Sequence, residues 1–307
     1  MNIKDLLRVS DLSRSDIEEI FELTDTLKKK RERGEVYAPL AGKTLGLIFS
    51  KASTRTRISF EAGMLQLGGH SIYLDQHNLQ MSRGESIKDS ARIFSAYLDG
   101  VVIRTFSHVE VEELAMTAMI PIINGLTDTH HPCQILADLY TIKSRLGRLE
   151  GVKIAYIGDG NNVVNSLMEG AAIFGMELTI STPKGYEPDA DILKMSEEVA
   201  AEAGGKISLC RDPMEAARKA DILYTDVWIS MGQEKERAKR EKDFKGYQIN
   251  NKILKQASKD ALVMHCLPAH RGEEITAEVI DGDRSIVFEE AENRLHVQKA
   301  VLQLLLS

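Results

Sequence analysis

The sequence predicts an α/β protein made of two doubly wound parallel-sheet domains that are linked by helices. The chain has 307 residues, which is more than one hydrophobic core usually supports, so two domains of roughly 150 residues are expected. Short apolar runs alternate with helical patterns in both halves, as in parallel sheets that are covered on both faces. Polar residues gather directly after these runs, where such sheets bind ligands. We therefore expect an active site in the cleft between the domains.

The first half repeats a strand and helix unit. Residues 12–30 place apolar side chains at helical spacing, with Ser13 or Ser15 as the cap and basic residues at the end. Residues 58–67 form a second helical pattern after a polar segment. The predicted strands of this half are 44–49, 101–103 and 120–123, and a helix follows Leu126.

The second half restarts with an almost continuous apolar strand and a glycine-rich turn. The predicted strands are 152–157, 178–180, 207–209, 222–224 and 262–264. The domain boundary is expected near residues 140–151. Residues 232–248 are charged and poor in apolar side chains, so we expect a mobile surface loop there.

Composition excludes several classes of function. The net charge of -7 argues against a surface for nucleic acid or an anionic membrane, since both need a basic footprint. No apolar run approaches the roughly 20 residues of a membrane helix, and the start of the sequence has no signal-peptide pattern, so a cytoplasmic enzyme is expected. The three cysteines Cys133, Cys210 and Cys266 are widely spaced, which predicts reduced thiols rather than disulfides or a zinc site.

A phosphate site is indicated after the first strand. Residues 53–57 read Ser-Thr-Arg-Thr-Arg and open a helix, so hydroxyl groups, guanidinium groups and free backbone N–H groups lie at a positive helix end. A capped helix with two solvated arginines is the alternative, and this motif alone does not decide between them.

Two later strands are also followed by polar side chains. Arg104 ends one of them and must face either solvent or a ligand. After the next strand, His131 could donate to a carbonyl oxygen and Gln134 could hold an amide. A histidine here could instead be structural, and the spacing of His130, His131 and Cys133 matches no common zinc site.

These motifs, in this order, resemble the carbamoyl phosphate site of the aspartate and ornithine transcarbamoylase family. The segments Asp-Val-Trp-Ile-Ser-Met-Gly at 226–232 and His-Cys-Leu-Pro at 265–268 resemble the motifs that bind ornithine in that family, and the resemblance covers nearly the whole chain. It implies transfer of the carbamoyl group of carbamoyl phosphate to the δ-amine of L-ornithine, which gives L-citrulline and phosphate in arginine metabolism, with the biosynthetic or degradative direction left open. No cofactor and no metal is implied.

The resemblance also implies roles for individual residues. Arg55, Arg104, His131 and Cys266 would be catalytic. The carbamoyl phosphate site would comprise Ser53, Thr54, Arg55, Thr56, Gln80, Arg104, His131, Gln134, Cys266, Leu267 and Arg294. The ornithine site would comprise Asn162, Asp226, Ser230 and Met231. Cys266 would accept a proton from the amine, although a buried core thiol is the common fate of a free cysteine.

Domain limits and assembly follow from the same resemblance. Residues 1–148 would bind carbamoyl phosphate, with a C-terminal helix at 290–307 packed back on them, and residues 149–289 would bind ornithine. The loop at 76–86, which carries Gln80, would reach the site of a neighbouring subunit, so a homotrimer with shared active sites is implied. Whether trimers assemble further stays open.

Two other readings compete with this one. A nicotinamide dehydrogenase is suggested by Gly158-Asp159-Gly160, but Val163 stands at the third glycine position and no acidic residue ends the next strand. A catalytically silent binding or scaffold protein is the second. Within the family, aspartate, putrescine or an acylated ornithine could be the acceptor instead. Aspartate is disfavoured because Asp226 would repel its side chain, and putrescine because it lacks the α-carboxylate that the Ser-Met-Gly segment would bind.

Overall fold

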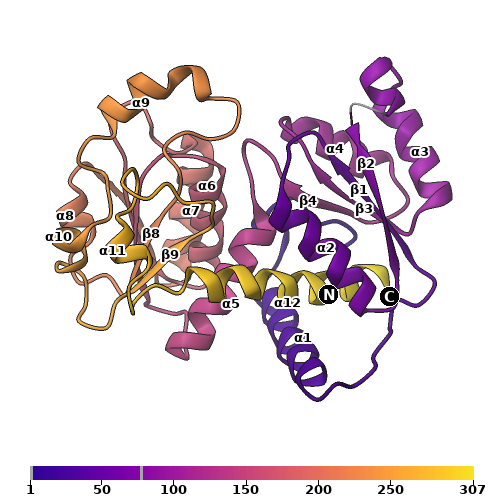
Figure 1. Cartoon of the computed structure of the whole chain (residues 1–307), viewed down its shortest axis with the longest axis horizontal. Helices are drawn as coiled ribbons and strands as arrows, with labels where there is room; N and C mark the ends of the chain where they lie inside the picture. Colours follow the sequence, from indigo (N-terminus) through magenta and orange to yellow (C-terminus); the bar gives the residue numbers. More distant parts are fainter. Residues whose placement is uncertain (1–2, 77–78) are drawn as a thin grey trace. The chain divides into compact units, whose positions relative to one another are not determined.

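The computed structural model describes residues 3–76 and 79–307, and these form two compact units (Figure 1). The first unit comprises Met1–Tyr140 and Glu292–Ser307, and the second comprises Thr141–Ala291. The chain passes between the units inside two helices, α5 (Pro132–Leu146) and α12 (Val287–Leu306). No helix within the described residues is long and apolar enough to span a membrane.

The first unit contains a four-stranded parallel sheet in the order β2-β1-β3-β4. Its strands are β1 (Thr44–Phe49), β2 (His70–Asp75), β3 (Gly100–Arg104) and β4 (Ile122–Leu126). Its other elements are η1 (Val9–Asp11), α1 (Arg14–Glu32), α2 (Thr54–Gln66), η3 (Gln80–Arg83), α3 (Ile87–Tyr97) and α4 (His108–Thr117), together with parts of α5 and α12. Apolar residues of α3 and α4 pack on β1, β3 and β4 to form one core.

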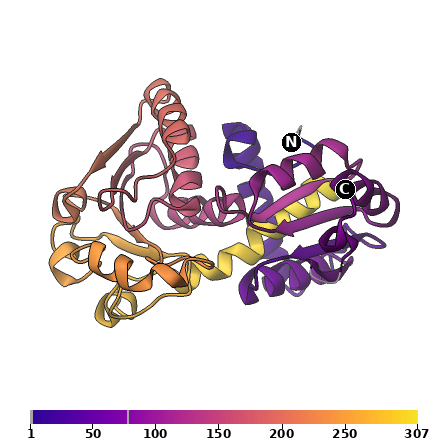
Figure 2. The ribbon, with the colours of Figure 1, turned by 90° about the horizontal axis from the view of Figure 1, so that it is seen from above.

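The second unit contains a five-stranded parallel sheet in the order β7-β6-β5-β8-β9. Its strands are β5 (Lys153–Ile157), β6 (Glu177–Ser181), β7 (Lys206–Cys210), β8 (Ile222–Thr225) and β9 (Leu262–His265). Its helices are α6 (Asn162–Ile173), α7 (Ala190–Glu202), α8 (Pro213–Ala216), η4 (Glu234–Glu236), α9 (Arg237–Asp243), α10 (Asn251–Leu254) and α11 (Ala277–Ile280). Figures 1 and 2 show α6 and α7 on one face of this sheet and α8, α10 and α11 on the other, which confirms the doubly wound architecture.

Both sheets reverse their strand order at one point, between β1 and β3 in the first and between β5 and β8 in the second. Ligands of open α/β sheets bind at such points, beyond the carboxyl ends of the strands. The residues that follow these four strands therefore define where each unit can bind a ligand.

The prediction of a mobile surface loop at residues 232–248 is wrong. These residues form η4 and α9, and Phe244 is fully buried against Tyr186 and Trp228. Arg240 fixes α9 because its guanidinium donates to the Asp159 carboxylate and to the Trp228 carbonyl, each at 2.9 Å. A buried aromatic and a buried ion pair thus hold a segment whose composition resembles that of a loop.

Candidate active site

Helix α2 begins at the predicted phosphate motif. Ser53 is its N-cap, and the Ser53 hydroxyl accepts a hydrogen bond from the Thr56 backbone N–H at 3.2 Å. An N-cap serine satisfies one of the helix's unpaired N–H groups and leaves others directed outward, toward the end of β1. The N-terminus of α2 therefore offers backbone donors and a positive dipole end to an anion.

Two arginines from distant parts of the sequence meet at Thr56. Arg294 of α12 donates to the Thr56 hydroxyl at 2.9 Å and to the Gln134 side-chain carbonyl at 3.0 Å. Arg104, at the end of β3, lies 3.5 Å from the same hydroxyl and is only 6% exposed. Gln134 is fixed in turn, since its amide donates to Asp138 at 2.8 Å.

His131 completes this group as a neutral imidazole. Burial lowers its pKa well below the usual value, and the positive charges of Arg294, Arg104 and Arg55 lower it further. A neutral imidazole still donates one hydrogen bond, so His131 can polarise a carbonyl oxygen without adding charge. We call residues 53–56 together with Arg104, His131, Gln134 and Arg294 the cationic edge.

Gln80, Cys266 and Leu267 are the members of the predicted carbamoyl phosphate site that lie outside the cationic edge. Gln80 begins η3 and is exposed, and within the described residues no hydrogen bond joins its side chain to the cationic edge. Thr54 is also exposed, at the first position of α2. The loop that carries Gln80 includes His77 and Asn78, which lie outside the described residues.

The second unit presents a carboxylate and a thiol at the carboxyl end of its sheet. Asp226 follows β8 directly, and the Cys266 thiol, which follows β9, donates to its carboxylate at 2.9 Å. Asn161 donates to the other carboxylate oxygen at 2.7 Å. We call Asn161, Asp226 and Cys266 the acidic edge.

Asn161 is a residue that sequence reasoning missed. It is the N-cap of α6, so its side-chain oxygen accepts from the backbone of Val163 and Val164, and the hydroxyl of Tyr156 donates to the same oxygen at 3.3 Å. With its oxygen turned to these donors, the amide nitrogen must face Asp226. The predicted Asn162 is the next residue and the first of α6. An Asx residue directly before a helical pattern was the available signal.

His265 supports the turn that carries Cys266 and Leu267. Its Nδ1 accepts from the Leu267 backbone N–H at 2.9 Å, so its Nε2 carries the proton and lies 3.0 Å from the Glu274 carboxylate. Leu267 has a positive φ of 55°, a conformation that residues other than glycine rarely adopt, so this turn needs such support. Asp226, His265 and Cys266 place donor atoms close enough to hold a metal ion, but both ring nitrogens of His265 are already engaged.

The predicted Ser230 and Met231 lie in the segment between β8 and η4. The Ser230 backbone N–H donates to the Gln233 side chain at 3.1 Å, and Met231 is 44% exposed. Gly232 has a φ of 96°, a conformation that glycine adopts without strain, and its N–H donates to Glu234. The segment is thus tied to η4, and through Arg240 and the Trp228 carbonyl to α9.

The glycine turn after β5 has a structural explanation. A Cβ at Gly160 would lie 2.3 Å from the backbone of Glu187 and Pro188, and the Gly160 N–H donates to the Tyr186 carbonyl. The chain's own backbone therefore occupies the close approach that a dinucleotide pyrophosphate would need, which removes the main support for a dehydrogenase.

The cysteines differ in environment. Cys133 is buried and donates to the Asn124 carbonyl, and burial raises its pKa to about 12. Cys210 donates to the Asp212 carbonyl near the end of β7. Of the three, Cys266 is the thiol that lies beside a carboxylate at the carboxyl edge of a sheet.

Comparison with known proteins places both units in one family. Residues 4–144 match the aspartate/ornithine carbamoyltransferase carbamoyl-P binding domain, and residues 150–305 match the Asp/Orn binding domain of the same family. The ornithine carbamoyltransferase of Syntrophus aciditrophicus (strain SB) is 56% identical over 303 residues, 99% of each chain. The structure of ornithine carbamoyltransferase from Pyrococcus furiosus is 49% identical with a TM-score of 0.96, covering 99% of this chain and 97% of that one. That from Gloeobacter violaceus is 48% identical with a TM-score of 0.88, covering 99% of both. The chain therefore belongs to the aspartate/ornithine carbamoyltransferase family.

Proposed function

We propose that this chain transfers the carbamoyl group of carbamoyl phosphate to the δ-amine of L-ornithine, which yields L-citrulline and phosphate for arginine biosynthesis in the cytoplasm. The observation that carries this proposal is the convergence of Arg104 and Arg294 on Thr56 at the N-terminus of α2. Such a cluster suits a phosphorylated, doubly negative substrate. Residues 1–148 with 290–307 bind carbamoyl phosphate, and residues 149–289 bind ornithine.

The cationic edge divides the substrate between two groups of donors. The N-terminus of α2, with Ser53, Thr54, Arg55 and Thr56, holds the phosphate. His131, Gln134, Arg104 and Arg294 take the carbamoyl end, and neutral His131 donates to its carbonyl oxygen. Burial lowers the pKa of His131 most, and Arg294, Arg104 and Arg55 lower it further. These arginines are the ones assigned to the substrate, which supports the proposal.

The acidic edge suits a cationic amino acid. Asp226 and Asn162 bind the amino group of ornithine, and Ser230 and Met231 approach its α-carboxylate. The δ-ammonium group has a pKa near 10.4 by analogy with lysine, so it must lose a proton before it attacks. The Cys266 thiol proton lies in its hydrogen bond to the Asp226 carboxylate. This pair of side chains can also accept the proton that the δ-ammonium group loses.

The reaction then balances as follows. The neutral amine attacks the carbonyl carbon, and the oxyanion that forms is stabilised by Arg104, His131 and Thr56. The carbon–oxygen bond to phosphate breaks, and a second amine proton leaves with the phosphate. The proton held by Cys266 and Asp226 passes to solvent. Carbamoyl phosphate binds first, and the segment at Ser230–Gly232 closes over ornithine.

An assay with three acceptor substrates distinguishes the activities that are possible within the family. The purified protein with carbamoyl phosphate is offered ornithine, putrescine or aspartate, and the ureido product is measured by a colorimetric assay beside phosphate release. We expect a ureido product when ornithine is the acceptor and none with putrescine or aspartate. If a ureido product formed with aspartate or putrescine instead, the assignment of ornithine as acceptor would be wrong. If no acceptor gave phosphate release, the protein would not be a carbamoyltransferase.

We further propose a homotrimer in which the loop that carries Gln80 serves a neighbouring subunit. Its support is the set of exposed apolar side chains on the first unit, Ile93, Tyr97, Val109, Met116 and Met119. Light scattering should give three times the 34.2 kDa chain mass, or a multiple of that trimer. A monomer would leave these side chains unexplained.

A further inference from the structure

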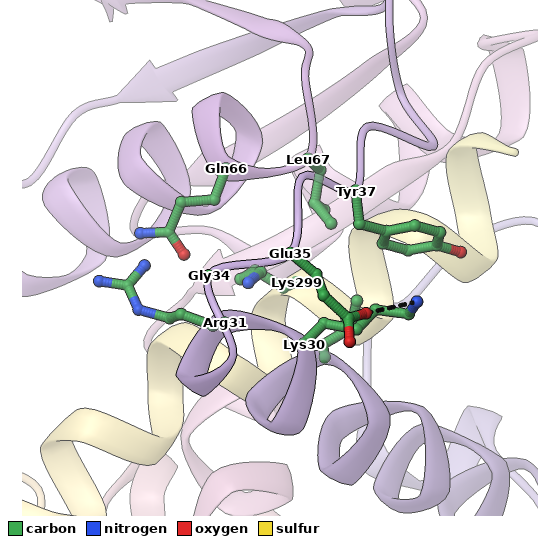
Figure 3. Close-up of a pocket in the computed structure, with 9 residues that line it drawn as sticks. Lys30, Arg31, Gly34, Glu35, Tyr37, Gln66, Leu67 and Lys299 are labelled. Carbon is green, nitrogen blue, oxygen red and sulfur yellow. Dashed lines mark hydrogen bonds and ion pairs between the residues drawn. The ribbon is translucent and has the colours of Figure 1, made fainter.

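A cationic pocket that is distinct from the cationic edge lies in the first unit, among α1, α2 and α12 (Figure 3). Its volume is about 230 Å³, below the roughly 300 Å³ at which pockets for drug-sized ligands begin. It therefore suits a small ligand. The residues around it are Leu27, Lys30, Arg31, Gly34, Glu35, Tyr37, Gln66, Leu67 and Lys299.

Two positive charges in this pocket lack a counter-charge. Lys30 pairs with Glu35 at 3.4 Å. Within residues 3–76 and 79–307, neither the Lys299 nor the Arg31 side chain forms a hydrogen bond or an ion pair; Arg31 is exposed, whereas Lys299 is only 4% exposed. Figure 3 shows the Lys299 ammonium end between Arg31 and Gln66 on one side and Glu35 and Tyr37 on the other. The Lys299 side chain is thus largely buried while its ammonium faces the pocket, and a positive charge in such surroundings is unfavourable unless something neutralises it.

The surroundings confirm that this region is strongly positive. Burial, and then the charge of Arg31, lower the pKa of Lys299. Burial together with Lys28, Lys299 and Arg31 lowers the pKa of nearby His296 to about 4. The side-chain oxygen of Gln66 is buried and has no hydrogen-bond partner within the described residues, so its amide can turn and donate. An anion would remove the repulsion and use these donors.

Packing alone does not explain the charge on Lys299. Its aliphatic stem crosses α2 at Gly63, where an added Cβ would lie 3.3 Å from the Lys299 Cγ. Methionine would fill this contact equally well. Lys30 and Arg31 are favoured by the C-terminal end of α1, but Lys299 lies in the interior of α12 and gains nothing from the end of its own helix.

We propose that this pocket is a binding site for a small dianionic phosphate, with Lys299 and Arg31 as its charged ligands and Gln66 as a further donor. Two uncompensated positive charges match the charge of a phosphate or phosphate monoester. The site is separate from the cationic edge, and the proposal does not rest on the proposed function.

Binding is tested by calorimetry and thermal unfolding in an Arg55→Ala background, which weakens the phosphate site at α2. Inorganic phosphate should still bind and raise the melting temperature. Lys299→Met and Arg31→Gln should each weaken this binding at least tenfold, because a charge-assisted contact is lost. Lys29→Met is the matched control, since Lys29 is exposed in the same turn of α1 and does not line the pocket, and it should bind as the background does.

Three further readouts separate a ligand site from a structural lysine. Without phosphate, Lys299→Met should melt no lower than its parent; a lower melting temperature there would mean that the charge serves the fold and would overturn the proposal. Equal phosphate binding with and without Lys299 would overturn it as well. Glycerol 3-phosphate is titrated in parallel. If it binds and the binding depends on Lys299, the ligands of the site include phosphate monoesters; if it does not bind, the site takes only the inorganic ion. Crystals soaked in tungstate should show anomalous density at Lys299, and density confined to residues 53–56 would contradict the assignment.

Discussion

Each unit has a parallel sheet that reverses its strand order at one point, but the two units present opposite charge at the carboxyl ends of their strands. In the first unit, Arg104 and Arg294 meet at the N-terminus of α2 around a neutral histidine. In the second, a carboxylate at Asp226 is held by an amide and a thiol. The glycine turn and helix N-terminus of the second unit would suit a phosphate by themselves, yet Asp226 and the backbone of residues 187–188 exclude one. One architecture therefore serves an anionic ligand in one unit and a cationic ligand in the other, through a few residues at the strand ends.

The largest effect is expected from the cationic edge. Arg104→Gln should lower kcat by roughly 10²–10³, because a preorganised donor to the oxyanion is lost. Arg57→Gln is the matched control, since Arg57 is half-exposed, pairs with Glu61 and lies over the ring of Tyr73. Steady-state kinetics with both substrates measure this. Equal losses in the two variants would mean that overall positive charge, and not the position of Arg104, matters.

The acidic edge should respond in turnover rather than in carbamoyl phosphate affinity. Cys266→Ser should reduce kcat by about 10²-fold, since a hydroxyl is a poorer partner for proton transfer than a thiol beside Asp226. Cys210→Ser, in the same unit, should leave kcat unchanged. The measurement is kcat beside the KM of each substrate. Full turnover in the Cys266 variant would remove the thiol from the mechanism.

A smaller effect on ornithine is expected from α9. Arg240→Gln breaks the buried contact with Asp159 and should cost about 3 kcal/mol of stability. Because Arg240 also holds the Trp228 carbonyl, the KM for ornithine should rise several-fold with that for carbamoyl phosphate unchanged. Arg237→Gln, on the exposed face of α9, should do neither. Kinetics and urea unfolding test both parts, and a rise in both KM values would contradict the division between the units.

The smallest effect is a dependence of stability on pH. His296 has a folded pKa of about 4, whereas the unfolded chain takes up this proton near pH 6.5. Stability should therefore fall as the pH drops from 6.5 to 4, by no more than about 2 kcal/mol from this residue, because solvent screening weakens the effect of the pKa shift. His296→Gln should flatten that part of the curve. Urea unfolding between pH 7 and pH 4.5 measures it, and parallel curves for the two proteins would rule out His296 as the source.

Much of the fold was predictable because buried parallel strands read as apolar runs. All eight predicted strands are present in the structure. Strand β2, which lies at the edge of its sheet, was not predicted. Its side chains are exposed or only partly buried, and its apolar run is limited to Ile72, Tyr73 and Leu74 between polar residues. The helix α9 was missed for the opposite reason, because one buried arginine and one buried phenylalanine hold a segment that is otherwise charged.

The candidate site was predictable where residues follow a strand directly, as Arg104 and Asp226 do. Contacts that depend on tertiary structure were not. Asn161 faces Asp226 only because its own oxygen caps α6, and Lys51 is buried because it pairs with Asp128 and lies over Phe106. Lys299 reads as an ordinary charge in a helical pattern, and its pocket exists only when three helices assemble.

The division of charge between the units is tested most directly by carbamoyl phosphate binding in the absence of ornithine. Calorimetry on the unmodified protein, Arg104→Gln and Asp226→Asn gives the dissociation constants. The account predicts at least tenfold weaker binding for the Arg104 variant and unchanged binding for the Asp226 variant. Weakening of carbamoyl phosphate binding by Asp226→Asn to the same extent would contradict it.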